Sequence, residues 1–408
     1  MINQYYKLLY LLPVGLITGP FIPDLIISIC VILFLFDTYR LKLFKYFDNK
    51  FFKLFLLFCL FLNISSLLSD NISSIKYSLS YLRFGIFSVF VFYVLKRYNS
   101  FKLYFSYLTI SVFLFLFIDS FIQLIFKKNI FLFKLQSYHS GLSYITSTFN
   151  EEKRLGSFIA RMYPLFLVSV ILIKNRIYLI DKYKEIIITI PLLLVILSTE
   201  RVSLFIISFC FFIFIFKSSI FFKNKFSILL LICPIILLFY FNPILLEKFI
   251  STFYLIGILD PGLNEAGEIK GGYIKGLFIF SKFHQDQLLN CIKLFTENIF
   301  TGIGPKNYKY YTDEWHPHNF HGQIIAEMGI FAYILFLIIF FNTGLRLFNF
   351  FFSKKKLVSI EELKLVILCS IFINFLPIPN GDFFNNWLNI IIYLPIGYYL
   401  YFNETKKI

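Results

Sequence analysis

Three of the five histidines in this chain of 408 residues lie in the stretch HPHNFHG, residues 316–322. Histidine titrates near neutral pH, so an imidazole here can take a proton from a hydroxyl nucleophile. Two other roles stay open for His316, His318 and His321: zinc coordination, and polar packing at a membrane interface. Zinc is disfavoured because Pro317 disrupts helical spacing and no cysteine or fourth ligand is nearby. We therefore interpret the stretch first as a source of a general base.

Three arginines offer a second kind of chemistry. Arg83, Arg161 and Arg201 are each predicted within about the first turn of an apolar span, at its outer end. A guanidinium can hold a phosphate through two parallel hydrogen bonds and stays charged. We expect capture of a diphosphate at headgroup depth, above all at Arg201, which stands between two apolar runs with almost no loop. Snorkelling to headgroups is the alternative for any single arginine.

Carboxylates give weaker signals. Asp119 and Gln123 lie four residues apart in an apolar run, where an unpaired aspartate is costly, so we expect a partner arginine or an aqueous cavity. A structural ion pair and a catalytic role are both open for Asp119. Glu151 and Glu152 are interpreted as solvated charges. GIGPKN, residues 302–307, lacks the Lys-Ser ending of a phosphate-binding loop and is interpreted as a turn before the histidines.

The elements that position these residues are predicted to be membrane spans. The chain is 58% hydrophobic, with recurring apolar runs of roughly 15 to 25 residues, and about 20 residues cross the hydrocarbon. We predict an all-α polytopic membrane protein, a single domain over residues 1–408, with about twelve transmembrane helices. Two spans flank TGPFIPD, and the others are 51–68, 81–95, 103–126, 157–173, 186–198, 202–216, 227–241, 324–342, 364–376 and 387–402.

The placement of basic residues predicts the orientation. Lys and Arg cluster in short loops after even-numbered spans, which the positive-inside rule assigns to the cytoplasm, and this location argues against nucleic-acid binding. Both termini then face the cytoplasm. Two long outer loops, about 127–156 and 242–323, contain all five histidines, including His139 and His284.

The larger outer loop, between the ninth and tenth spans, is predicted to contain short helices. One of them is an amphipathic helix on the membrane surface, with Leu288, Ile292 and Phe295 along its apolar stripe.

Seven stretches of the chain, in this order, resemble the O-antigen ligase and O-antigen polymerase superfamily. The most specific are Thr-Glu-Arg at 199–201 and Gly-Ile-Gly followed by His-Pro-His-Asn, and the resemblance extends from the first predicted span to the tenth. The stretches are TGPFIPDLIIS, SYLRFGIF, DSFIQLIFKKNIF, STFNEEKRLGSFIARMYPLF, LSTERVSLF, NIFTGIGPKNYKYY and HPHNFHGQIIAEMGIFAYILF.

The resemblance implies an inverting, metal-independent glycosyltransferase of the bacterial inner membrane, without a cofactor and with its active site facing the periplasm. The donor is then a glycan on undecaprenyl diphosphate. Arg201 is expected to hold the diphosphate and His318 to lie at the acceptor hydroxyl, as the two catalytic residues. Relatives often carry an arginine where this chain has Tyr144, and either Arg154 or Arg161 is expected to replace it. The other expected substrate contacts are Arg83, Arg154, Arg161, Asn319, His284, Glu152 and Glu327.

Ligase and polymerase share this architecture and differ in the acceptor, which is lipid A-core for a ligase and a second carrier-linked repeat for a polymerase. We favour the ligase because the histidine stretch ends a single dominant outer loop. A lipid-linked sugar transporter is the alternative from another class; transporters favour midplane sites between broken helices, often with internal repeats. A structural scaffold would leave the clustering of polar groups at one face unexplained. The expected partners are the carrier-linked glycan, an acceptor glycan and membrane lipids.

Overall fold

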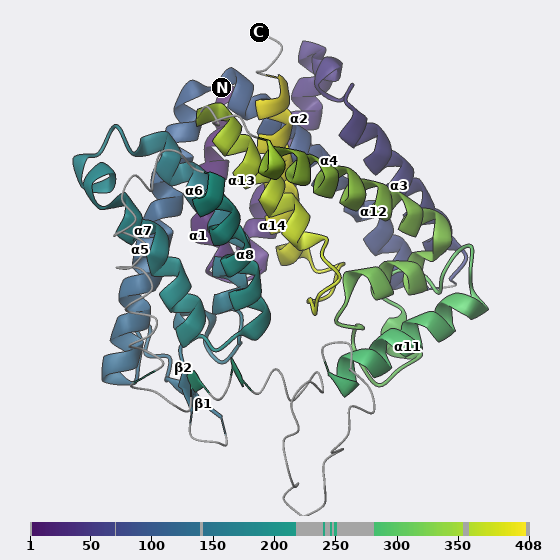
Figure 1. Cartoon of the computed structure of the whole chain (residues 1–408). Helices are drawn as coiled ribbons and strands as arrows, with labels where there is room; N and C mark the ends of the chain where they lie inside the picture. The colour runs from purple at the N-terminus through teal and green to yellow at the C-terminus, as the bar shows by residue number, and fades with distance from the viewer. Residues whose placement is uncertain are drawn as a thin grey trace, which may run out of the picture.

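The computed structural model describes residues 2–69, 71–138, 142–217, 240, 245–246, 249–250, 281–353 and 359–404. That part of the chain forms twelve α-helices, four 3-10 helices and a two-stranded antiparallel sheet (Figure 1). The α-helices are α1 (Leu12–Leu16), α2 (Phe21–Leu41), α3 (Lys50–Leu67), α4 (Ile72–Arg97), α5 (Asn99–Phe126), α6 (Leu155–Ile173), α7 (Tyr178–Leu197), α8 (Arg201–Lys217), α11 (Lys282–Glu297), α12 (Phe320–Phe352), α13 (Ser359–Asn374) and α14 (Asn386–Glu404). The remaining elements are η1 (Ile2–Leu11), η2 (Leu43–Tyr46), η3 (Ser147–Phe149), η4 (Tyr308–Tyr310), β1 (Gln136–Ser137) and β2 (Ser143–Tyr144).

Six helices, α2 to α6 and α12, are long and apolar enough to cross a membrane by their length and composition. Large apolar side chains are also exposed on their outer faces, such as Phe21, Ile32 and Phe36 on α2. Such surfaces are unfavourable in water and are satisfied by lipid. The chain is therefore a helical membrane protein, as its composition predicted, while the number of twelve spans remains a prediction.

The helices match most of the predicted spans, and the differences have local causes. Asn71 starts α4 well before the predicted boundary at 81, because its side chain accepts a hydrogen bond from the Ser73 amide (2.9 Å). The span predicted at 186–198 is only the later part of α7, which has a non-helical residue at Tyr183. The first predicted span is largely the 3-10 helix η1. The ninth predicted span and most of the outer loop up to residue 280 lie outside the described residues.

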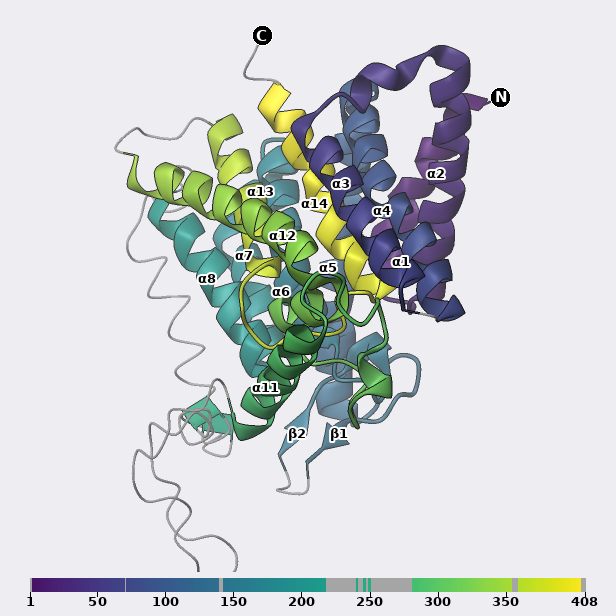
Figure 2. The same cartoon turned by 90° about the vertical axis from the view of Figure 1, so that its right-hand side faces the viewer.

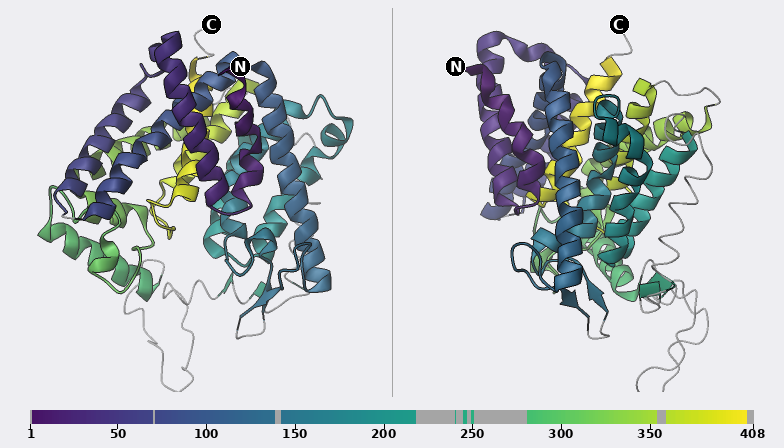
Figure 3. Two further views of the ribbon diagram at one scale, coloured as in Figure 1. Left: turned by 180° about the vertical axis from the view of Figure 1, so that it is seen from behind. Right: turned by 90° about the vertical axis from the view of Figure 1, so that its left-hand side faces the viewer.

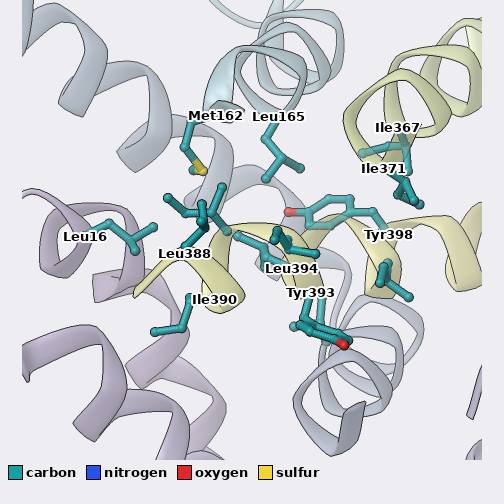
Figure 4. Packing of buried hydrophobic residues seen from close by; sticks show 14 of the residues in the cluster. Leu16, Met162, Leu165, Ile367, Ile371, Leu388, Ile390, Tyr393, Leu394 and Tyr398 are labelled. Carbon is teal, nitrogen blue, oxygen red and sulfur yellow. The ribbon is translucent and has the colours of Figure 1, made fainter. Parts of the chain in front are cut away.

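Helix α14 is the centre of the apolar core. Its side chains face α6, α13 and α1, with Leu388, Leu394 and Tyr398 among those drawn in Figure 4. Gly397 lets α14 approach α4 closely, since an added Cβ would lie 2.5 Å from the Cβ of Val91. The first half of the chain is thereby packed onto its last helix.

The two ends of the molecule differ. The first 3-10 helix and the end of α14 lie together at one end, and β1, β2 and α11 lie at the other (Figures 1 and 3). The first and last described helices thus share one end of the molecule, and the cytoplasmic location of both termini remains a prediction.

Helix α12 is broken at Gly329, which has φ +73°. The carbonyl groups of Ala326 and Glu327 accept hydrogen bonds from the amides of Ile303 (3.0 Å) and Gly304 (2.9 Å). The segment before the histidines therefore lies directly against the broken helix. Gly302 has φ +66°, and an added Cβ there would lie 2.4 Å from the carbonyl carbon of Glu327. The Gly-Ile-Gly motif is thus required by backbone packing.

Replacing Gly302 by alanine is expected to destabilise the fold by at least roughly 1–2 kcal/mol, because the left-handed conformation alone costs that much for an L-residue. The contact with Glu327 adds to this cost. Thermal unfolding of the purified protein in detergent measures the effect. The matched control is Gly381→Ala, since an added Cβ there has ordinary contacts and no positive φ. Equal melting temperatures for the two variants would contradict this account.

The amphipathic helix predicted before the histidines is present as α11, and the face that it packs against the protein differs from the stripe predicted to face the membrane. Gln287, Cys291 and Leu294 are buried, whereas Ile292 is 48% exposed. The buried face of α11 packs against the start of α12, where the Sγ atom of Cys291 lies close to Gly322. Its position on the membrane surface remains a prediction.

Candidate functional site

Three histidines from two parts of the chain come together near the start of α12. The ring centroids of His316 and His318 are 4.1 Å apart, and the ring of His284 from α11 is 6.0 Å from that of His318. The Nε2 atom of His316 and the Nδ1 atom of His284 are buried without a hydrogen-bond partner. We call His284, His316 and His318 the histidine group; it includes only two of the three residues grouped by the sequence.

His321 has a different role from its neighbours. Its Nε2 atom lies 2.8 Å from the carbonyl oxygen of Phe375, and its Nδ1 atom lies 3.2 Å from the Tyr333 hydroxyl. Both ring nitrogens thus have partners, one within α12 and one at the end of α13. His139 lies outside the described residues.

Burial keeps the histidine group uncharged. It lowers the pKa of His316 to about 4, with a smaller contribution from the charge of His318. It also lowers the pKa of His318, against an opposing effect of Glu314, and the pKa of His284. Near pH 7 these imidazoles are therefore neutral and able to accept a proton. In the described part of the chain, no three His, Cys, Asp or Glu side chains are grouped to hold a metal ion.

The backbone around His318 is tightly defined. His318 has φ +53°, which is uncommon for a side chain of this size, and its carbonyl accepts a hydrogen bond from the Asn380 amide (2.8 Å). Asn319 caps α12 by accepting from the Gly322 amide (3.0 Å). No described residue hydrogen-bonds to a ring nitrogen of His318. The imidazole is thus held in place by its backbone while its nitrogens stay available.

Glu327 and Asp382 are connected to each other through the side chain of Gln323. Glu327 is fully buried and accepts from the Tyr308 amide (2.9 Å) and the Gln323 side chain (3.1 Å). The same Gln323 amide donates to Asp382 (2.7 Å), whose charge interacts with His316. The sequence reasoning missed Asp382. Its only signal was a polar Asn-Gly-Asp sequence directly before the last apolar run.

Arg161 lies in the second turn of α6 rather than in the first, and it is 3% exposed. Its guanidinium donates to the side-chain oxygens of Asn374 (3.4 Å) and Asn380. No carboxylate in the described residues lies within 4.0 Å of it. Since Asn380 also bonds the His318 carbonyl, Arg161 is connected to the histidine group from behind. Snorkelling to headgroups is wrong for this residue.

Arg83 and Arg154 have carboxylate partners. Arg83 lies about three turns into α4, which begins at Ile72, and forms a 2.9 Å ion pair with Asp24. Its predicted place in the first turn of a helix is therefore wrong, while its depth in the membrane remains a prediction. Arg154 and Glu152 form a 2.7 Å ion pair with side chains that are 42% and 57% exposed. This surface pair contributes little to stability.

Arg201 is half-buried at the first residue of α8. The Lys153 ammonium lies 5.3 Å from the centre of the Tyr144 ring. Lys153 thus places a positive charge beside Tyr144, whereas Arg154 pairs with Glu152 and Arg161 donates to Asn374 and Asn380. The charge of Lys153 also interacts with Glu200, the residue before Arg201.

Among the residues that the structure describes, Asp119 has no arginine partner, contrary to one of the two expectations for it. The buried carboxylate accepts hydrogen bonds from the Ile130 amide (2.9 Å), the Asn129 side chain (3.1 Å) and the Ser147 hydroxyl. Gln123 likewise accepts from the Ser147 amide (2.9 Å). These two side chains fasten the loop after α5 to that helix, which favours a structural role.

The fold and these groups together define a polytopic helical membrane protein with neutral imidazoles and an arginine linked to them at one end of its bundle. No model of a known protein family matches the chain, and no curated protein matches it.

Proposed function

We propose that this protein is a membrane glycosyltransferase of the O-antigen ligase type, acting at the periplasmic face of the bacterial inner membrane. Its donor is a glycan on undecaprenyl diphosphate, and its acceptor is a hydroxyl of lipid A-core. The observation that carries the proposal is His318, an imidazole kept neutral by burial, with ring nitrogens that no described residue occupies. The resemblance of the motifs around Arg201 and His318 supplies the substrate class.

The proposed reaction needs one proton acceptor and one anion holder. The acceptor oxygen attacks the anomeric carbon of the donor from the face opposite the diphosphate, so the configuration inverts. The new glycosidic bond forms as the bond from the anomeric carbon to the diphosphate oxygen breaks, and undecaprenyl diphosphate leaves with the electron pair. His318 accepts the hydroxyl proton. Arg201 offsets the negative charge that grows on the leaving diphosphate.

The break in α12 is the one observation that favours a transporter, since broken helices are typical of transporter binding sites. The backbone groups at this break already have partners, however. The Glu327 carbonyl accepts from the Gly304 amide and from the Ser65 hydroxyl (2.7 Å). Because these backbone groups bond to other parts of the protein, they are not free to bind a transported substrate. An enzyme therefore remains the better proposal.

Purified protein tests the proposal directly. Undecaprenyl-diphosphate-linked glycan is supplied with lipid A-core or with a second carrier-linked repeat, and products are identified by mass spectrometry. Product with lipid A-core supports a ligase, and product with the carrier-linked repeat identifies a polymerase. Folded protein that turns over neither acceptor would reject the proposal, and transport across a bilayer without turnover would favour the transporter.

Loss of the gene in the native host gives an independent result. A vanished lipopolysaccharide ladder with long polymer left on the carrier is expected for a ligase. Collapse of the ladder to core plus one repeat would identify a polymerase.

A further inference from the structure

Lys306 is a half-buried cation without a direct carboxylate partner. Its Nζ atom lies 4.1 Å from the centre of the Tyr77 ring on α4. In the described part of the chain, no carboxylate oxygen comes within 4.0 Å of it. Because Lys306 is partly buried, its charge is only partly solvated, and its pKa is lowered. An ammonium in this state is well suited to bind an external anion.

The backbone holds Lys306 in an uncommon conformation. Its φ is +63°, which costs about 1 kcal/mol for a residue with a side chain. The next residue, Asn307, is fixed on both sides of its amide: it donates to the Ile303 carbonyl (2.8 Å) and accepts from Asn71 (2.6 Å). Strained residues that are fixed in this way occur preferentially at functional sites.

The neighbouring acidic groups do not neutralise Lys306 by contact. The Asp382 carboxylate accepts from Gln323 and from the Phe384 amide (2.9 Å). The charge of Arg83 also interacts with Lys306, and the Nε atom of Arg83 is buried without a partner. Lys306 at the Tyr77 ring is thus within electrostatic range of a second cation, Arg83, whose terminal nitrogens donate to Ser80 and Asp24.

Lys306 is placed beside the histidine group but apart from Arg201. Its charge interacts with Asp382, which in turn interacts with His316. Lys306 contacts α4, whereas Arg201 begins α8, and these helices lie on different sides of α14 (Figure 2). The histidine group thus has two candidate anion-binding residues: Lys306 on the side of α4 and Arg201 on the side of α8.

We propose that Lys306, positioned by the Tyr77 ring and assisted by the charge of Arg83, binds a phosphate group of the acceptor, so that the acceptor is an anionic glycolipid. This inference rests on the proposed function, in which the donor diphosphate is held at Arg201. The acceptor phosphate bound at Lys306 positions the acceptor, so that the acceptor hydroxyl reaches His318 from the side of α4.

Calorimetric titration of the purified chain with inorganic pyrophosphate, in a neutral detergent, tests this second anion site. We expect two binding events in the native chain, and in Lys306→Met the loss of one or its weakening by at least about tenfold, with retention in Lys306→Arg. The matched control is Lys309→Met, from the same loop, whose ammonium lies over the exposed rings of Tyr310 and Trp315. Equal binding by Lys306→Met and Lys309→Met would overturn the proposal.

Two further arms separate the related outcomes. Nanodiscs of phosphatidylglycerol, compared with phosphatidylcholine, test whether the phosphate comes from the bilayer; loss of the Lys306-dependent event only in phosphatidylglycerol would overturn the assignment to the acceptor. Arg201→Ala is expected to remove the other binding event alone. Its failure to do so would count against the proposed donor site and leave the Lys306 site standing.

Discussion

Replacing His318 by alanine is expected to slow glycan transfer by at least about a hundredfold, because a positioned general base contributes 10²–10⁴-fold. The imidazole is neutral, its nitrogens are available among the described residues, and its backbone is fixed by Asn380. Initial rates of purified protein measure the effect. The matched control is His321→Gln, which removes a histidine already bonded to Phe375 and is expected to keep most of the activity. Equal losses in the two variants would contradict a special role for His318.

The same assignment fixes the sign of the pH dependence. Burial lowers the pKa of His318 below its ordinary value of about 6.5, so the base form is present at pH 7 and above. As the pH falls through that lowered pKa, the imidazole becomes charged and the rate is expected to fall. A profile of kcat against pH shows the acid limb below about pH 6.5. A limb that persists unchanged in a weakly active His318→Gln variant would assign the titration to another group.

The long apolar helices were predictable from sequence because lipid imposes a length and an apolar composition on any helix that crosses it. Helices α3, α5 and α6 therefore match their predicted ranges closely. The break at Gly329 was not predictable. It depends on the amides of Ile303 and Gly304, which reach the carbonyl groups of α12 only in the folded chain. The sequence of α12 alone does not indicate that contact.

The candidate site was predictable where chemistry and position coincide, as at His316 and His318. His284 was predicted as a substrate contact, and its contact with these rings depends on how α11 packs against α12. Asp382 and Asn380 were missed because the segment before α14 has no chemical signature of its own. Their roles come from tertiary partners, chiefly Gln323 and Arg161.

Arg161→Met is expected to lower kcat by about tenfold or more while leaving pyrophosphate affinity unchanged, since a small misplacement of a catalytic group is costly. The guanidinium holds the Asn380 side chain, and the Asn380 amide holds the His318 carbonyl, so Arg161 positions the base without touching substrate. Steady-state kinetics and the pyrophosphate titration measure the two quantities. Had Arg161 gripped the donor diphosphate, as the sequence alone predicts, pyrophosphate affinity and KM for the donor would change instead.

Stability and coupling separate this positioning role from a general loss of structure. Arg161→Met leaves the oxygens of Asn374 and Asn380 unsatisfied, at a cost of about 1–3 kcal/mol for each buried group. The surface variant Arg154→Met provides the control, with an expected cost below about 1 kcal/mol. Asn380→Ala should reproduce the loss of kcat, and the double variant with Arg161→Met should be no slower than either alone, because both act on one contact. Independent, multiplying losses would instead mean that Arg161 and Asn380 act on different parts of the reaction.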